Sequence, residues 1–218
     1  GPSTEAVQRL IVRELVGALA PVRPIASPWR TMGTFFGSSL VVVAGAAATT
    51  DRAGLHVMTT VQTAAVLAVS ALAVAFLSLS LSRHATPGSA HRVSPVVLLS
   101  FCGLGLLAVL VSLFPWRASD QFVAIGWPCS ARELALATPL MGLCWWVLSR
   151  RLALPSAVLG ATIAGTAGVT SFAILQVQCA LQDAPHLLAW HGGALAFLVG
   201  AAALAGHILR NRMTPPVE

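Results

Sequence analysis

The chain has 218 residues, of which 56% are apolar and only 9% are charged. A soluble domain usually carries about 25% charged residues, so this composition and the mean hydropathy of +0.82 argue against a soluble protein and predict one compact membrane domain. They also exclude a disordered chain. The net charge of +6 comes from 13 arginines and no lysine, placed at the ends of apolar stretches, which argues against direct nucleic-acid binding.

The N-terminal segment, residues 1–30, is predicted to be cytoplasmic and to carry an amphipathic helix over residues 4–20. Its first two residues resemble the remnant of a cleaved affinity tag. Two interpretations of the helix are open. It could lie on the inner leaflet, which periodicity alone favours, or it could dock into a groove of a cytosolic protein. The apolar positions that recur at helical spacing are Val7, Leu10, Ile11, Leu15, Ala18 and Leu19.

Six apolar stretches are each long enough to cross a bilayer, which needs about 20 residues. They predict an all-α integral membrane protein with a six-helix domain over 31–209 and a cytoplasmic tail over 210–218. Glu133 is placed at the edge of the fourth stretch, so that no Asp, Glu or Arg is expected inside any span. The predicted spans are 31–49, 56–82, 95–115, 133–149, 154–179 and 186–209.

The distribution of arginine across the loops predicts the orientation of these spans. Ten arginines fall in the N-terminal segment, the second and fourth loops and the tail, all on one side. Only Arg52, Arg117 and Arg132 fall on the other side. Because arginine accumulates in cytoplasmic loops, both termini are predicted to be cytoplasmic.

The four cysteines are predicted to form two classes. Cys102 and Cys144 fall within spans, where a free cysteine behaves as a small hydrophobic residue. Cys129 and Cys179 flank the fourth and fifth spans on the outer side, and are predicted to lie close together. For this pair a disulfide, a thiol switch and binding of a soft metal ion all remain open.

Two histidines near the outer cysteines are candidate partners for a metal ion. His186 and His191 follow Cys179, and the acidic residues Asp183 and Glu133 lie nearby in the sequence. The spacing is not a recognised metal pattern, because residues five apart diverge by roughly 140° on a continuous α-helix. No cofactor is predicted with certainty, and a metal ion at the cysteine pair is the candidate.

Patterns typical of enzymes and haem proteins are absent from the sequence. We find no GxSxG, HExxH, Walker A or helix-opening GxGxxG pattern, and predict that the chain is not an enzyme. A haem between two spans would need histidines on different helices, whereas His191 and His207 share one span. Without acidic residues in the spans, proton-coupled transport lacks its usual carriers.

Three stretches, taken in order, carry a resemblance to a known family. They are Ala-Pro-Val-Arg-Pro at 20–24 with Ser-Pro-Trp-Arg at 27–30, Cys-Ser-Ala-Arg-Glu at 129–133, and the run from Cys179 to Trp190-His191. Together with the fifty-residue interval between the outer cysteines and the six spans, they resemble the NrsF family of bacterial membrane anti-sigma factors, which includes CarR-type regulators.

The resemblance implies a multi-pass protein of the bacterial inner membrane that sequesters an extracytoplasmic-function sigma factor. The sigma factor would be released on a periplasmic metal or oxidative signal sensed near Cys129 and Cys179. The resemblance also favours the docking interpretation of the N-terminal helix. The alternatives are a small-solute or ion carrier and a structural subunit of a membrane complex. The implied docking residues are Val7, Leu10, Ile11, Leu15, Leu19 and Arg23.

Overall fold

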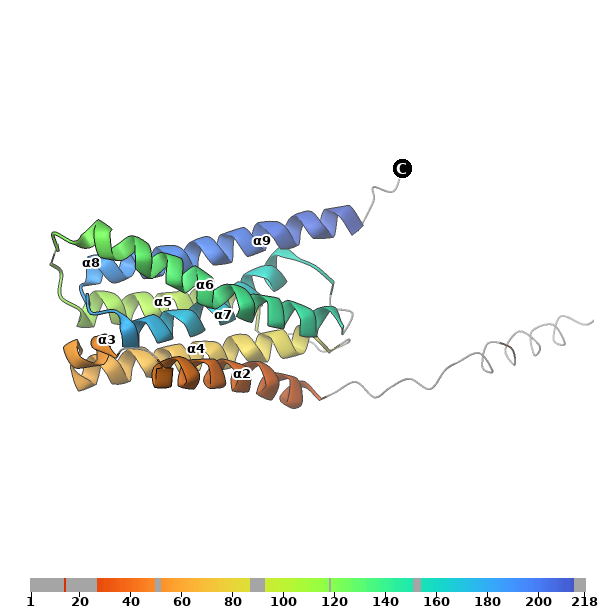
Figure 1. Ribbon diagram of the computed structural model, residues 1–218. Helices are drawn as coiled ribbons and strands as arrows, with labels where there is room; N and C mark the ends of the chain where they lie inside the picture. Colours follow the sequence, from red (N-terminus) through yellow and green to blue (C-terminus); the bar gives the residue numbers. More distant parts are fainter. Residues whose placement is uncertain are drawn as a thin grey trace, which may run out of the picture.

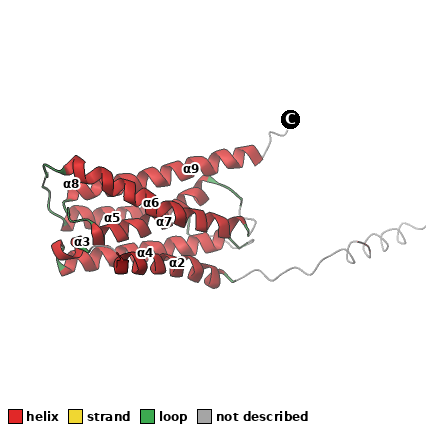
Figure 2. Cartoon of the chain, in the orientation of Figure 1, coloured by secondary structure: helices red, strands yellow, loops and turns green. Residues whose placement is uncertain are grey.

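The structure is a computed structural model, and it describes residues 14, 27–49, 52–86, 93–117, 119–150 and 154–213. Within these residues every regular element is a helix, and the connecting loops lie at the two ends of the molecule (Figures 1 and 2). The elements are α2 (Pro28–Thr49), α3 (Ala53–Val57), α4 (Thr60–His84), α5 (Pro95–Leu113), α6 (Phe122–Ser149), α7 (Ala157–Gln178), α8 (Ala184–His186), the π-helix η1 (Leu187–Gly192) and α9 (Gly193–Met213).

The long helices lie side by side along one direction, with α3 and α8 at one end and the C-terminus of α9 at the other (Figure 1). Five helices are long and apolar enough to cross a membrane: α2, α4, α5, α7 and the continuous run Ala184–Met213. The predicted all-α class is therefore confirmed, and five of the six predicted spans are found by length and composition.

The centre of the bundle is α7, which packs most extensively against α9, α4 and α6. Nearly all of its side chains are buried, including every residue from 161 to 177. Its approach to α9 requires glycine at two positions. A Cβ atom on Gly160 would overlap the carbonyl of Ala202 in α9, and one on Gly206 would overlap the carbonyl of Ser156. Small residues at these points let the two backbones pack closely.

The second predicted span is wrong at its beginning. The apolar stretch 56–82 is divided between α3 and α4 because Thr59 caps α4. The Thr59 hydroxyl accepts a hydrogen bond from the Gln62 N–H at 3.2 Å, and Gln62 Oε1 accepts one from the Thr59 N–H at 2.8 Å. This reciprocal pair is a capping box. Gln62 Nε2 also donates to the Leu113 carbonyl at 2.7 Å, which joins the start of α4 to the end of α5.

The fourth predicted span is also wrong at its beginning, because α6 starts at Phe122 rather than at 133. Pro128 and Pro139 lie inside α6 without ending it. In a packed bundle, neighbouring groups can satisfy the carbonyl that a proline leaves without its helical partner. Arg132 and Glu133 consequently lie within this helix, contrary to the expectation that the fourth helix contains no charged residue. Glu133 is fully buried.

The two inner cysteines are buried, as predicted. Cys102 packs in an apolar cluster with Leu77 and Phe172, and Cys144 packs in another with Phe35 and Leu148. Within the described part of the chain, these two clusters do not include Cys129 or Cys179. Cys102 and Cys144 therefore serve as natural controls for experiments on the outer pair.

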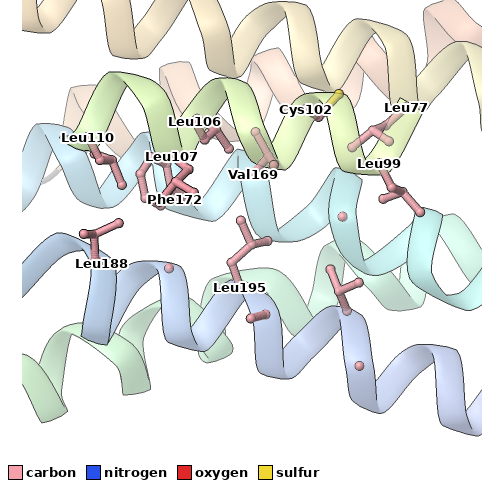
Figure 3. Close-up of a pocket in the computed structure, with 16 residues that line it drawn as sticks. Leu77, Leu99, Cys102, Leu106, Leu107, Leu110, Val169, Phe172, Leu188 and Leu195 are labelled. Atoms are coloured by element: carbon pink, nitrogen blue, oxygen red, sulfur yellow. The ribbon is translucent and has the colours of Figure 1, made fainter. Parts of the chain in front are cut away.

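An apolar cavity of about 560 Å³ lies between α5, α7 and α9 (Figure 3). Leu106 of α5, Val169 and Phe172 of α7, and Leu195 of α9 are among the side chains that line it. The lining contains no charged residue. The cavity therefore offers apolar packing rather than a polar binding site.

Candidate metal centre

Four potential metal ligands meet at the end of the bundle where α3 and α8 lie. Cys129 belongs to α6, Cys179 follows the last residue of α7, His186 ends α8, and His191 lies in η1. One ligand atom of each residue lies within 4.8 Å of the others, and all four residues are buried. The structure thus brings together the four residues that the sequence offered as a metal site.

The distances within this cluster are close to those of a metal centre. Cys129 Sγ lies 3.6 Å from Cys179 Sγ, and Cys179 Sγ lies 3.5 Å from His186 Nε2. The predicted proximity of the two cysteines is confirmed, and both are free thiols. A tetrahedral zinc ion bound by sulfur and nitrogen holds its ligand atoms about 3.3–3.8 Å apart, given bonds of about 2.3 and 2.0–2.1 Å. The separations between the two sulfur atoms and between Cys179 Sγ and His186 Nε2 therefore already fit a tetrahedral ion.

The π-helix explains how the two histidines meet. On an α-helix His186 and His191 would point in different directions, and their spacing gave no metal pattern in the sequence. In η1 the backbone hydrogen bonds join each residue to the fifth residue after it, so residues five apart lie about as close in direction as residues four apart on an α-helix. The rings of His186 and His191 are 5.3 Å apart. The divergence of roughly 140° that holds for a continuous α-helix does not apply here, because a π-helix joins these residues.

Contacts from α6 hold η1 in place next to Cys129. The Ser130 hydroxyl donates a hydrogen bond of 2.7 Å to the Trp190 carbonyl. The Trp190 indole lies against Gly126, where any Cβ atom would collide with the ring. Phe122 adds a tilted ring contact with Trp190 at 5.7 Å between centroids. The first turns of α6 thus fix both Cys129 and the helix that carries His191.

A second set of contacts fixes Cys179 at the end of α7. The Gln182 amide donates to the Cys179 carbonyl at 2.6 Å and to the Gln176 carbonyl at 3.1 Å. On the other side α3 approaches so closely that a Cβ atom on Gly54 would overlap the carbonyls of Gln176, Val177 and Cys179. The backbone that carries this ligand is therefore held from two sides.

Several polar atoms around the cluster have no hydrogen-bond partner among the described residues. They include both ring nitrogens of His191, Nδ1 of His186 and both carboxyl oxygens of Glu133. Buried polar groups are normally hydrogen-bonded, and exceptions call for an explanation such as a bound ion. Glu133 was expected near Cys129 at the edge of a span, and its burial was not predicted.

The surroundings of Cys179 favour the protonated thiol over the free thiolate. Its hydrogen bond with Cys129, together with burial, raises the pKa of the Cys179 thiol above its ordinary value. The thiol therefore keeps its proton at neutral pH until a metal ion competes for the sulfur.

The other predicted site residues fall elsewhere. Asp183 precedes α8 and does not belong to the ligand cluster. The six residues assigned to sigma-factor docking lie outside the described residues. They are Val7, Leu10, Ile11, Leu15, Leu19 and Arg23.

Comparison with models of known protein families, with curated proteins and with solved structures finds no match. Function must therefore be inferred from the chemistry of the cluster and from the sequence resemblance. Two sulfur and two nitrogen donors form the ligand set of tetrahedral zinc sites, and sulfur donors also accept softer ions.

Proposed function

We propose that this protein is a membrane-embedded metal sensor that acts as an anti-sigma factor. The single observation that carries the sensing part is the buried cluster of Cys129, Cys179, His186 and His191, whose ligand atoms lie within 4.8 Å of one another. The ligands come from three separate parts of the bundle, α6, the end of α7 and the α8–η1 run. A bound ion would therefore couple the positions of these elements.

The chemistry of the cluster favours a borderline or soft divalent ion. Thiolate sulfur and imidazole nitrogen suit ions such as Zn²⁺ and Cd²⁺, whereas Mg²⁺ and Ca²⁺ prefer oxygen ligands. Binding displaces the thiol protons, so the ion is held by two thiolates and two neutral imidazoles.

The anti-sigma output is supported by the sequence resemblance. In this proposal the cytoplasmic N-terminal segment holds an extracytoplasmic-function sigma factor on its apolar face, and metal binding shifts the bundle to a state that releases it. In this role the chain itself does not need to bind DNA, since the sigma factor makes the contacts with DNA.

The proposal places the protein in the bacterial inner membrane with six spans and both termini in the cytoplasm. In this topology α6 is the fourth of the six spans in chain order. Its 28 residues reach about 42 Å, which exceeds the hydrocarbon thickness of about 30 Å. The metal cluster then lies at the periplasmic end, where it meets ions entering from outside.

The close cysteine pair also supports an oxidative signal at the same site. An oxidant such as peroxide would take two electrons from the two thiols, two protons would leave, and a disulfide would join Cys129 to Cys179. The sulfur atoms, at 3.6 Å, need little movement for this reaction. Loss of the thiols would then remove two metal ligands.

Metal titration of the purified full chain in detergent tests the sensing part. We expect one Cd²⁺ per chain, with ultraviolet absorption from thiolate ligands. Cys129→Ser and Cys179→Ser should each weaken binding at least about tenfold, as loss of a ligand or its support does. Cys102→Ser and Cys144→Ser remove buried thiols outside the cluster and should leave binding unchanged. Equal binding by all four variants would contradict the proposed site.

Co-purification from bacteria tests the anti-sigma part. The cognate sigma factor should be retained by the wild-type chain and released by cadmium in the medium. Leu10→Asp with Leu15→Asp should abolish retention, because both residues belong to the predicted apolar face, while metal binding by the bundle stays normal. Retention of the sigma factor by a chain lacking residues 3–20 would contradict docking through this segment.

A further inference from the structure

Glu133 is an acidic residue in the interior of the bundle whose role the proposed metal site leaves unexplained. Its side chain is fully buried. Neither of its carboxyl oxygens has a hydrogen-bond partner among the described residues. Leaving a buried carboxyl group without a partner is costly, and buried charges in proteins are usually paired or bind metal ions.

The position of Glu133 on α6 connects it to the metal cluster. It follows Cys129 by four residues, and both residues belong to the buried face of α6. Residues at this spacing on a helix have their Cβ atoms about 5–6 Å apart. Its carboxyl oxygens lie outside the group of four ligand atoms that are within 4.8 Å of one another, so the side chain must turn toward the ion to bind it. One turn of α6 thus presents a sulfur donor and an oxygen donor to the same part of the interior.

Nearby residues give this carboxyl group no other explanation. Arg132, its neighbour in the chain, is exposed rather than buried with it. Asp183, another acidic residue at this end of the bundle, is only partly buried. Glu133 is therefore the one fully buried acid among the residues that the structure describes.

We propose that Glu133 is a fifth donor of the metal centre and binds the ion through its carboxylate. This inference rests on the proposed metal site and specifies its chemistry. Two thiolates and one carboxylate give the donor set three negative charges, which favours a divalent ion over monovalent copper. A set of two sulfur atoms, two nitrogen atoms and one oxygen atom selects borderline ions that accept mixed donors, such as Zn²⁺, Co²⁺, Ni²⁺ and Cd²⁺.

Cobalt is a suitable probe because its visible spectrum reports the number of ligands. The full chain in detergent is titrated with Co²⁺ as wild type, Glu133→Gln and Asp183→Asn. We expect Glu133→Gln to keep the sulfur-to-cobalt charge-transfer band, since both cysteines still bind. Its d–d bands should shift and gain intensity as the centre changes from five to four ligands, and its affinity should fall about 10–100-fold. Asp183→Asn removes a charge at the same end and should match the wild type.

The outcomes separate this inference from the proposed function. A wild-type chain without a charge-transfer band would overturn the metal site itself. A wild-type band together with an unchanged spectrum and affinity in Glu133→Gln would overturn only the role of Glu133. If Glu133→Gln does not fold, X-ray absorption of the wild-type zinc complex decides. A shell of two sulfur and two nitrogen atoms without oxygen would then overturn the inference.

Discussion

Gly126 shows how a single residue of α6 controls the geometry of the proposed metal centre. It leaves the space in which the Trp190 indole packs, and any Cβ atom there would collide with the indole ring. Trp190 directly precedes His191, and its carbonyl accepts the hydrogen bond from Ser130. A side chain at position 126 therefore displaces the part of η1 that carries a metal ligand.

We predict that Gly126→Ala lowers metal affinity and destabilises the bundle by about 1–3 kcal/mol, the usual cost of overpacking. Gly142→Ala is the matched control. It lies on the same helix, and a Cβ atom there meets nothing within 4 Å. Cadmium titration and thermal unfolding in detergent measure both effects. Equal affinity and stability in the two variants would show that Trp190 moves aside without affecting His191.

At the residue scale the sequence predicted thiol chemistry better than carboxyl chemistry. The two classes of cysteine followed from position, since Cys102 and Cys144 fell inside apolar stretches and Cys129 and Cys179 fell at their ends. The burial of Glu133 did not follow, because an acidic residue beside an arginine is typical of a helix boundary in water. Glu133 is buried because α6 packs against α7, and a local sequence pattern does not reveal such packing between distant segments.

Among the elements, η1 is the one whose geometry the metal centre depends on most directly. π-Helices are uncommon overall, but many of those that occur lie at functional sites. They accommodate one extra residue within an α-helix. Residues five apart in such a turn take the places that residues four apart have in an α-helix. The single extra residue in η1 thus brings the ring centroids of His186 and His191 to 5.3 Å from each other.

We predict that deletion of the exposed residue Ala189 preserves metal binding. The histidines would then be four apart on an α-helix, within about 40° of one another. Insertion of one alanine after Ala189 makes them six apart, about 120° from alignment, and should reduce affinity at least about tenfold. Cadmium titration of both variants checks this. Loss of binding on deletion, with binding kept on insertion, would contradict the proposed role of the π-helix.

Helix existence was predictable from hydropathy, whereas two helix beginnings were not. The apolar run 56–82 concealed the break before α4, although Thr59 and Gln62 have the spacing of a capping box. The beginning of α6 was missed because the sequence there resembles a loop. Pro128 and the charged pair Arg132 and Glu133 are typical of a loop in isolation, but the helix continues through them because it packs on its neighbours.

Considered as a whole, the molecule is organised around α7, with the ligand-bearing elements gathered at one end of that helix (Figure 1). The helical class and the proximity of the outer cysteines could be predicted from the sequence. The full ligand cluster could not, because it depends on a π-helix and on side-chain packing between distant segments. A signal at the cluster would act on α6, α7 and α9 together, since all three pack on one another.

The number of membrane crossings determines where the two termini lie. Five helices qualify as spans by length and hydropathy, and an odd number of crossings would place the termini on opposite sides. α6 extends alongside the others for 28 residues and packs against the central helix α7. With α6 as a sixth crossing, both termini lie on the arginine-rich cytoplasmic side.

We therefore predict that green fluorescent protein fused after residue 218 fluoresces in bacteria, and that alkaline phosphatase fused there is inactive. The same phosphatase inserted in the loop between α5 and α6 should be active. Phosphatase activity at residue 218 would instead mean that α6 does not cross, and would place the metal cluster and the docking segment in a different arrangement.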